Sequence, residues 1–139
     1  MKVGKKIGLI DNQDALIGNP AYDLVSLIDD VRIKTSKKLK NQIYNYYIKK
    51  TPKFEKNNSE KFLEDFNILS IQRSLKIIGI FSRLFIRDKK DKYLKLIPYA
   101  WKLLEMRIRS EFFSELRKNL DSCIPRKIRK KIRKKNLYL

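Results

Sequence analysis

Histidine is absent from this chain of 139 residues, and cysteine, glycine and proline are scarce. Without histidine, the chain lacks the commonest general base and metal ligand found in proteins. The single cysteine, Cys123, excludes an intrachain disulfide, so the composition does not imply an oxidising compartment. The four glycines, at positions 4, 8, 18 and 79, are too scattered to form a glycine-rich phosphate-binding loop.

Long hydrophobic runs are absent as well, because charged residues interrupt every apolar stretch. The N-terminal residues 1–6 contain lysines with no long apolar segment behind them, so the sequence predicts neither a signal peptide nor a membrane-spanning helix. We therefore expect a cytoplasmic protein with no membrane partner. The length and the 42% hydrophobic content suffice for one domain built around one core.

Acidic residues are few: 15 Asp and Glu stand against 34 Lys and Arg, which gives a formal net charge of +19. A charge of this size attracts polyanions through long-range fields. Lysine, isoleucine and asparagine dominate the whole length, so we interpret much of the charge as a compositional bias at solvated positions. We predict a folded part over residues 1–124, followed by a basic helical or disordered tail over residues 125–139.

Apolar residues recur at helical spacing along most of the chain. The second helix is expected to carry Leu39, Ile43, Tyr46 and Tyr47 on one side. In the third, residues 77–81 are expected to be the most buried, with Gly79 permitting close approach of a neighbour. Pro98 should kink or break the fourth. The fold class is mainly α, a short N-terminal strand or hairpin followed by five or six helices, with helices predicted near residues 20–31, 36–50, 59–86, 93–108 and 110–120.

A carboxylate follows the N-terminal strand pattern. Residues 7–10 (IGLI) form a short apolar run typical of a buried strand, and Asp11 stands at its end before a polar turn. A carboxylate delivered at the edge of a sheet can hold a hard cation such as magnesium. This pattern is common, and only the longer string around it is specific.

That longer string resembles the aminoglycoside-phosphotransferase family, which has a protein-kinase-like fold. Within the family it looks most like the branch of sugar kinases that phosphorylate N-acetylmuramate and N-acetylglucosamine at the anomeric hydroxyl. The resemblance spans roughly residues 7–105, in order and with family-like spacing. It is carried by residues 8–15 (GLIDNQDA), 18–27 (GNPAYDLVSL), 30–32 (DVR), 72–84 (QRSLKIIGIFSRL), 93–94 (YL) and 98–101 (PYAW).

The resemblance implies roles for five residues and two cofactors, ATP and Mg²⁺. Asp11 matches the metal-binding aspartate, which anchors the magnesium ion that bridges the phosphate oxygens. Asp14 could assist the cation through water or stabilise the turn. Asp23 is expected to favour the start of a helix. Asp30 and Arg73 match positions around the acceptor pocket, where Arg73 could pair with the lactyl carboxylate of N-acetylmuramate, or they form an interhelix salt bridge.

Other parts of a kinase cannot be located in the sequence. In the family, the catalytic aspartate lies in a histidine-containing loop upstream of the Asp11 strand, and no phosphate-covering loop is found here either. In the resembling branch the residue after the metal-binding aspartate is usually Phe, where this chain has Asn12. We therefore expect the C-terminal lobe of an amino-sugar kinase of peptidoglycan recycling that is inactive alone. A separately encoded N-terminal lobe could complete it.

A second hypothesis comes from a different class of protein. A basic helical nucleic-acid-binding module would use the run at 126–135 to contact phosphates and tyrosines to stack on bases. The candidate stacking residues are Tyr44, Tyr46 and Tyr47. Tyrosines at this spacing on a helix are more often core or groove residues, and a lysine-rich tail is usually solvated.

Overall fold

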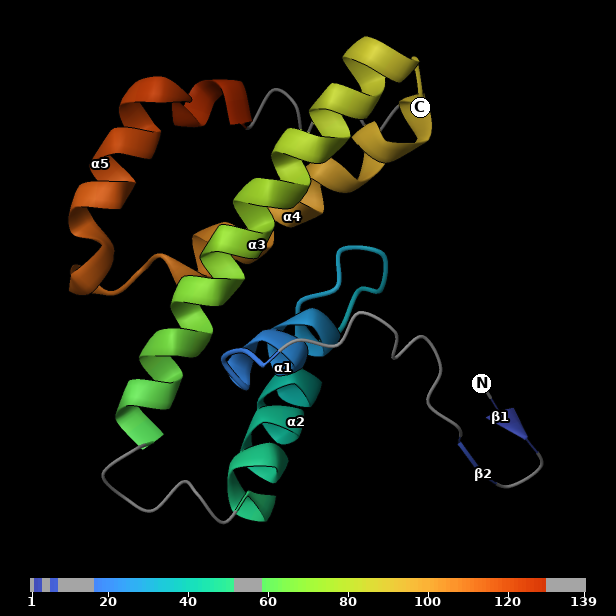
Figure 1. Ribbon diagram of the computed structural model, residues 1–139. Coiled ribbons are helices and arrows are strands. Elements are labelled where there is room, and N and C mark those ends of the chain that lie inside the picture. The colour runs from blue at the N-terminus through green and yellow to red at the C-terminus, as the bar shows by residue number, and fades with distance from the viewer. Residues whose placement is uncertain (1, 4–5, 8–16, 52–58, 130–139) are drawn as a thin grey trace.

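The computed structural model describes residues 2–3, 6–7, 17–51 and 59–129, and the fold over these ranges is mainly helical (Figure 1). The predicted fold class is confirmed. The described helices are α1 (Ala21–Ile28), α2 (Lys37–Lys50), α3 (Ser59–Asp88), η1 (Asp91–Leu96), α4 (Ile97–Arg107), η2 (Glu111–Phe113) and α5 (Ser114–Cys123), where η marks a 3₁₀ helix.

Two short strands precede the helices. Strand β1 (Lys2–Val3) pairs antiparallel with β2 (Lys6–Ile7). The strand predicted at residues 7–10 lies, apart from Ile7, outside the described residues.

Local sequence signals set the starts of the first two helices. The Asn19 side chain accepts a hydrogen bond from the Ala21 amide at 2.9 Å, and Pro20 stands directly before α1. Ser36 caps α2 by accepting a hydrogen bond from the Leu39 amide at 3.2 Å. Both helices therefore begin close to the starts predicted near residues 20 and 36.

The long helix α3 is the element against which α1, η1 and α4 pack (Figure 1). Its N-terminal half faces α1 and α2, and its C-terminal half faces η1 and α4. Pro98 lies in the first turn of α4, after the 3₁₀ helix η1, so the predicted break is the outcome rather than a kink. The 30-residue helix α3 thus joins two groups of helices, one packed on each of its halves.

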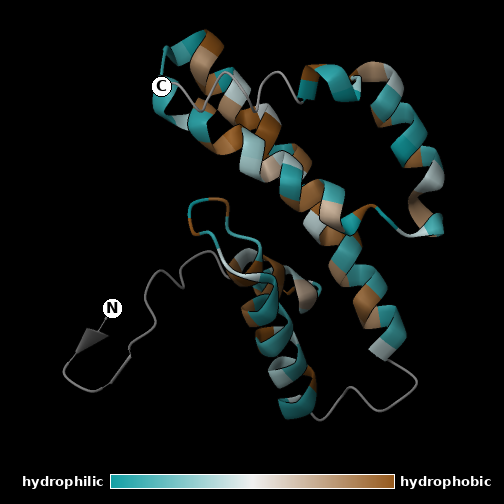
Figure 2. Cartoon of the chain, turned by 180° about the vertical axis from the view of Figure 1, so that it is seen from behind, coloured by the Kyte–Doolittle hydropathy of each residue, from teal (hydrophilic) through white to brown (hydrophobic). Residues whose placement is uncertain are grey.

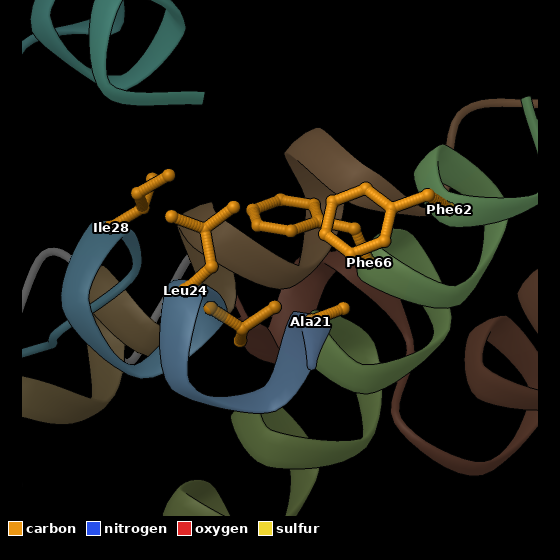
Figure 3. Packing of buried hydrophobic residues seen from close by; sticks show 6 residues of the cluster. Ala21, Leu24, Ile28, Phe62 and Phe66 are labelled. Carbon is orange, nitrogen blue, oxygen red and sulfur yellow. The ribbon is translucent and has the colours of Figure 1, made fainter. Parts of the chain in front are cut away.

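The core has two main parts along α3. In the first, Leu24 and Ile28 of α1 lie toward Phe62 and Phe66 of α3 (Figure 3). The second gathers around the Trp101 ring, which is 1% exposed. Burial of these large side chains is the main apolar contribution to stability. The second part joins α3, α4 and η2 through Ile71, Ile97, Trp101, Leu104, Ile108 and Phe113, and the partly buried Leu116 and Leu120 of α5 pack against it.

The buried face of α2 differs from the predicted one. Ile43, Tyr44, Tyr47 and Ile48 pack on the first core, whereas Leu39 and Tyr46 are 47% and 65% exposed. Hydrophilic residues cover much of α2 in the hydropathy view (Figure 2). The apolar residues of this helix are spread over more than one side, so spacing alone did not identify the side that packs.

The expectation for residues 77–81 was wrong. Gly79 is exposed, and a β-carbon added there would meet nothing within 4 Å. The buried positions of α3 lie instead between residues 62 and 74, for example Phe66, Ser70 and Ser74. The C-terminal half is apolar in sequence but has neighbours on one side only, so no close helix approach requires this glycine.

In the described ranges, no helix combines the length and the apolar character that crossing a bilayer requires.

Replacing Gly79 with alanine should stabilise the fold. Glycine in a helix interior costs roughly 0.5–1 kcal/mol relative to alanine, and open space at this position means that the new methyl group clashes with nothing. We expect Gly79→Ala to raise the free energy of unfolding by about that amount in urea titrations. Lys76→Gly, at an exposed site on the same helix, should lower it similarly. A loss of stability in Gly79→Ala would contradict the open surroundings.

Candidate functional site

Two neighbouring aspartates follow the end of α1 and have opposite surroundings. Asp29 is 2% exposed and lies between α1, α2, α3 and α4. The side chain of Asp30 is 14% exposed and faces the chain that follows. The backbone turn after Ile28 therefore sends one carboxylate inward and the next one toward the surface.

Asp29 holds the inward position through three cationic or hydroxyl partners. Its Oδ1 accepts a hydrogen bond from Lys40 Nζ at 2.8 Å, and its Oδ2 accepts one from Ser70 Oγ at 2.7 Å. Lys40 also donates to the Ile28 carbonyl. A buried lysine, 5% exposed, thus has both a carboxylate and a helix C-terminal carbonyl as partners.

Arg107, in the last turn of α4, completes the ring of donors around Asp29. Its Nε lies 3.0 Å from Oδ2 and its Nη2 lies 3.3 Å from Oδ1, so the carboxylate is held in a bidentate grip. The guanidinium also lies 4.7 Å from the centroid of the Phe66 ring. Arg107 therefore links the polar network to the first apolar core.

The charge state of Asp29 follows from these contacts. Burial alone raises the pKa of its carboxyl group. The positive charge of Arg107 and hydrogen bonds from Arg107, Lys40 and Ser70 together outweigh that effect, and the pKa lies below its ordinary value. Asp29 is consequently ionised at neutral pH and acts as a fixed structural anion.

Asp30 belongs to a second, more exposed group that includes both predicted acceptor-pocket residues. Arg32 donates to Asp30 through its backbone amide at 2.8 Å and through its Nη2 at 2.8 Å. Hydrogen bonds from Arg32 lower the pKa of the Asp30 carboxyl group against a smaller opposing effect of burial, and the charge of Arg73 lowers it further. The charge of Arg73 therefore acts on Asp30 from a distance, and Arg32 is the direct hydrogen-bonding partner of Asp30.

Arg73 projects from α3 toward Tyr22 of α1. One of its terminal nitrogens, Nη1, donates to the Tyr22 hydroxyl at 3.4 Å, and the guanidinium lies 5.8 Å from the centroid of the same ring. The Nε–H group of Arg73 is buried and has no hydrogen-bond partner among the described residues. Because this donor has no partner, the guanidinium has unused hydrogen-bonding capacity. A buried donor left unpaired costs about 1–3 kcal/mol of stability. We call Tyr22, Asp30, Arg32 and Arg73 the α1–α3 polar cluster.

The remaining predicted site residues are not brought into this cluster. Asp11 and Asp14 lie outside the described residues. Asp23 is exposed in the first turn of α1, which is the position its predicted interaction with the helix dipole requires. Across the described ranges, no group of three or more Asp, Glu, His or Cys residues is arranged to hold a metal ion.

The aromatic residues of α2 do not form the platform that the nucleic-acid hypothesis requires. The Tyr47 ring stacks on Phe62 at a centroid distance of 5.7 Å, and the Tyr44 ring meets Phe66 edge-on at 5.3 Å. Both rings are thus used in the first core. Tyr46 alone of the three is exposed, which weighs against a base-stacking surface on this helix.

Sequence reasoning missed the three charged residues of the Asp29 network. Asp29 and Lys40 fall between apolar positions and look like solvated residues, and Arg107 is 78 positions away from Asp29. A usable signal was the position of Asp29 directly after the last buried residue of α1, where the chain turns into the interior. The partners could not be paired without the helix packing.

Removing the buried charge of Asp29 should lower the free energy of unfolding far more than removing the charge of Asp30. Asp29→Asn leaves Lys40 without a counter-ion in the interior, and loss of one partner of a buried pair costs about 3–5 kcal/mol. Asp30→Asn removes a pair whose arginine is 73% exposed, so we expect a change of less than about 1 kcal/mol. Urea unfolding of the two variants measures the difference. Equal losses would contradict the anchoring role of Asp29.

The same network predicts a pH dependence. The lowered pKa of Asp29 in the folded state means that its stabilisation is fully present above the unfolded-state pKa, about 3.9, and is lost as the pH falls through the folded value. Stability of the wild type should therefore fall more steeply below about pH 4 than that of a double variant, Asp29→Asn with Lys40→Met. Parallel curves would contradict an ionised Asp29.

Comparison with known proteins gives several similar sequences, all called N-acetylmuramate/N-acetylglucosamine kinase. The protein of that name from Caulobacter vibrioides is 30% identical over 120 residues, which cover 86% of this chain and 32% of the relative. The one from Neisseria meningitidis serogroup B is 40% identical over 94 residues, 66% of this chain and 28% of the relative. The one from Pseudomonas aeruginosa is 35% identical over 106 residues, 70% of this chain and 30% of the relative.

No family model matches the chain, and no solved structure matches it. The chain spans about a third of the length of the curated relatives it matches. Over most of its own length, this helical chain is therefore similar to one part of sugar kinases that carry a single common name.

Proposed function

We propose that the chain is the C-terminal helical part of an ATP-dependent kinase that phosphorylates a hydroxyl group of an amino sugar of the N-acetylmuramate or N-acetylglucosamine type. The observation that carries this proposal is the match of 86% of the chain to a relative with that name. Because the match covers 32% of that relative, we propose further that the chain is inactive alone and that the remaining machinery comes from other polypeptide sequence.

The α1–α3 polar cluster is the proposed acceptor-side surface. Arg73 offers a cation with an unpaired Nε–H, and Tyr22 offers a hydroxyl and a ring face beside it. A carboxylate at the terminal nitrogens of Arg73 would gain charge-assisted hydrogen bonds. N-acetylmuramate carries such a carboxylate on its lactyl group, whereas N-acetylglucosamine does not. Asp30, held ionised by Arg32, would keep the Arg73 guanidinium oriented.

Asp11 is the residue proposed to hold magnesium. A carboxylate oxygen is the donor that this hard cation prefers, and Asp14 could contribute through a water molecule. Magnesium bound there would neutralise charge on the transferring phosphoryl group. The described residues contain no group of ligands that could replace Asp11, so the other ligands would be supplied by ATP, water and the rest of the enzyme.

A chimeric kinase tests the proposal. The segment of the Caulobacter relative that this chain matches would be replaced by this chain, and phosphorylation of both sugars would be followed with radiolabelled ATP. We expect product from the chimera and none from the chain alone. Asp11→Asn in the chimera should lower the rate by roughly 1,000-fold or more, because removing a metal anchor forfeits several kcal/mol of transition-state stabilisation. A folded but inactive chimera, beside an active parent enzyme, would contradict the assignment.

Arg73 provides a finer test of the acceptor. Arg73→Gln in the chimera should raise KM for N-acetylmuramate by about 10- to 100-fold, with little change in kcat. This factor corresponds to the binding free energy of a hydrogen bond between charged groups. For N-acetylglucosamine, which lacks the carboxylate, KM should change less than about threefold. Arg83→Gln, at an exposed position on the same helix, is the matched charge control. Equal effects on both sugars would contradict carboxylate recognition by Arg73.

A further inference from the structure

A concave site lies between α4 and α5 and shares no residue with the α1–α3 polar cluster. Its volume is about 480 Å³, within the range of small-molecule pockets. None of its lining residues belongs to the cluster or to the Asp29 network. The lining is formed by Leu104, Glu105, Ile108, Arg109, Arg117, Leu120, Asp121, Arg126 and Arg129.

Two of the four arginines are fixed in the wall by backbone carbonyls. Arg117 Nη1 donates to the carbonyls of Ile108 and Arg109 at 3.1 and 3.0 Å. Arg129 donates to the carbonyls of Leu120 and Ile124, both at 2.6 Å. Side chains anchored in this way are pre-organised, so little conformational entropy is lost when a ligand meets their remaining donors.

Arg129 is the deepest of the four. Its side chain is 5% exposed, and its guanidinium lies 4.9 Å from the centroid of the Trp101 ring in the second core. Its Nη2 also lies 2.8 Å from Asp121 Oδ1. The residue follows α5 in a short helical stretch, residues 126–129, so the first turn of the basic run takes part in the fold.

The charge of the pocket is not balanced. Asp121 is shared between Arg129 and Arg126, whose Nη2 lies 3.2 Å from Asp121 Oδ2. Arg117 has a single carboxylate contact, a 3.7 Å pair with a Glu111 side chain that is 91% exposed. Arg109 is exposed, and within the described ranges its side chain forms no hydrogen bond or ion pair. Four arginines against the carboxylates Glu105 and Asp121 leave an excess of two positive charges.

The rest of the wall is apolar. Leu104 and Ile108 come from α4, and Leu120 comes from α5. An inorganic ion would not contact these aliphatic side chains, which would remain hydrated. A ligand with an anionic head and a less polar body would meet both the guanidinium groups and the aliphatic side chains.

We propose that this pocket binds a small phosphate monoester, with the phosphate held by Arg109 and Arg117 and the organic body lying against Leu104, Ile108 and Leu120. A phosphate carries about two negative charges at neutral pH and three acceptor oxygens, which match the excess charge and the planar donor forks. A carboxylate would satisfy half of that excess. The pocket is built entirely from residues 104–129, so the proposal stands or falls independently of the kinase function.

The test uses the full chain and glucose 1-phosphate as the probe, with glucose and inorganic phosphate as comparison ligands, in isothermal titration calorimetry at 100 mM salt. We expect glucose 1-phosphate to bind more tightly than either comparison ligand. Arg109→Gln should weaken its binding by about tenfold or more, because a charge-assisted contact is lost. The Arg109 side chain has no described partner, and its backbone carbonyl is unchanged by the substitution, so this variant should unfold at the wild-type temperature.

Lys102→Gln provides the matched control. It removes one positive charge from an exposed position on α4, the helix that precedes Arg109, and outside the pocket. We expect less than a twofold change, since distant surface charges are screened at this ionic strength. Arg117→Lys, which keeps the charge but loses the planar fork, should weaken binding in a variant whose folding is checked by circular dichroism. Equal losses in Arg109→Gln and Lys102→Gln, or absence of glucose 1-phosphate binding, would overturn the proposal.

Discussion

The buried carboxylate of Asp29 is the constraint on which the arrangement of the helices depends. Lys40 of α2, Ser70 of α3 and Arg107 of α4 all donate to it, and Asp29 itself ends α1. An ionised group in the interior is stable only when its partners are placed accurately, so each of these helices is restricted in rotation and register by one anion. Apolar contacts hold the helices together, and the Asp29 network determines which faces meet.

That restriction also sets the position of the α1–α3 polar cluster. Asp30 is covalently next to Asp29, so fixing the inward carboxylate fixes the point at which the outward one emerges. Arg73 lies three residues after Ser70 on α3, less than one helical turn away from a donor to Asp29. The proposed acceptor residues therefore sit beside a rigid anchor, which is the arrangement that precise recognition of a substrate requires.

Short-range features of the fold could be predicted from the sequence, and features that depend on packing could not. The cap at Ser36, the helix start after Asn19-Pro20 and the break at Pro98 depend on a few neighbouring residues. The exposure of Gly79 and the buried side of α2 depend on which helices arrive as neighbours, and apolar spacing does not contain that information. For the site, Asp30 and Arg73 were found through resemblance to a family, whereas the network that positions them joins residues up to 78 positions apart.

The shortage of acidic residues explains how the interior accommodates its cations. With 34 basic and 15 acidic residues, the cations outnumber the carboxylates by 19. Helix ends offer a substitute, because their unpaired carbonyls carry partial negative charge. Arg117 binds carbonyls where α4 ends, and Arg129 binds carbonyls at the end of α5. Aromatic faces are a second substitute, used by Arg107 on Phe66 and Arg129 on Trp101. Part of the positive charge is therefore structural, and the arginines with donors still unused are the ones able to recognise an anion.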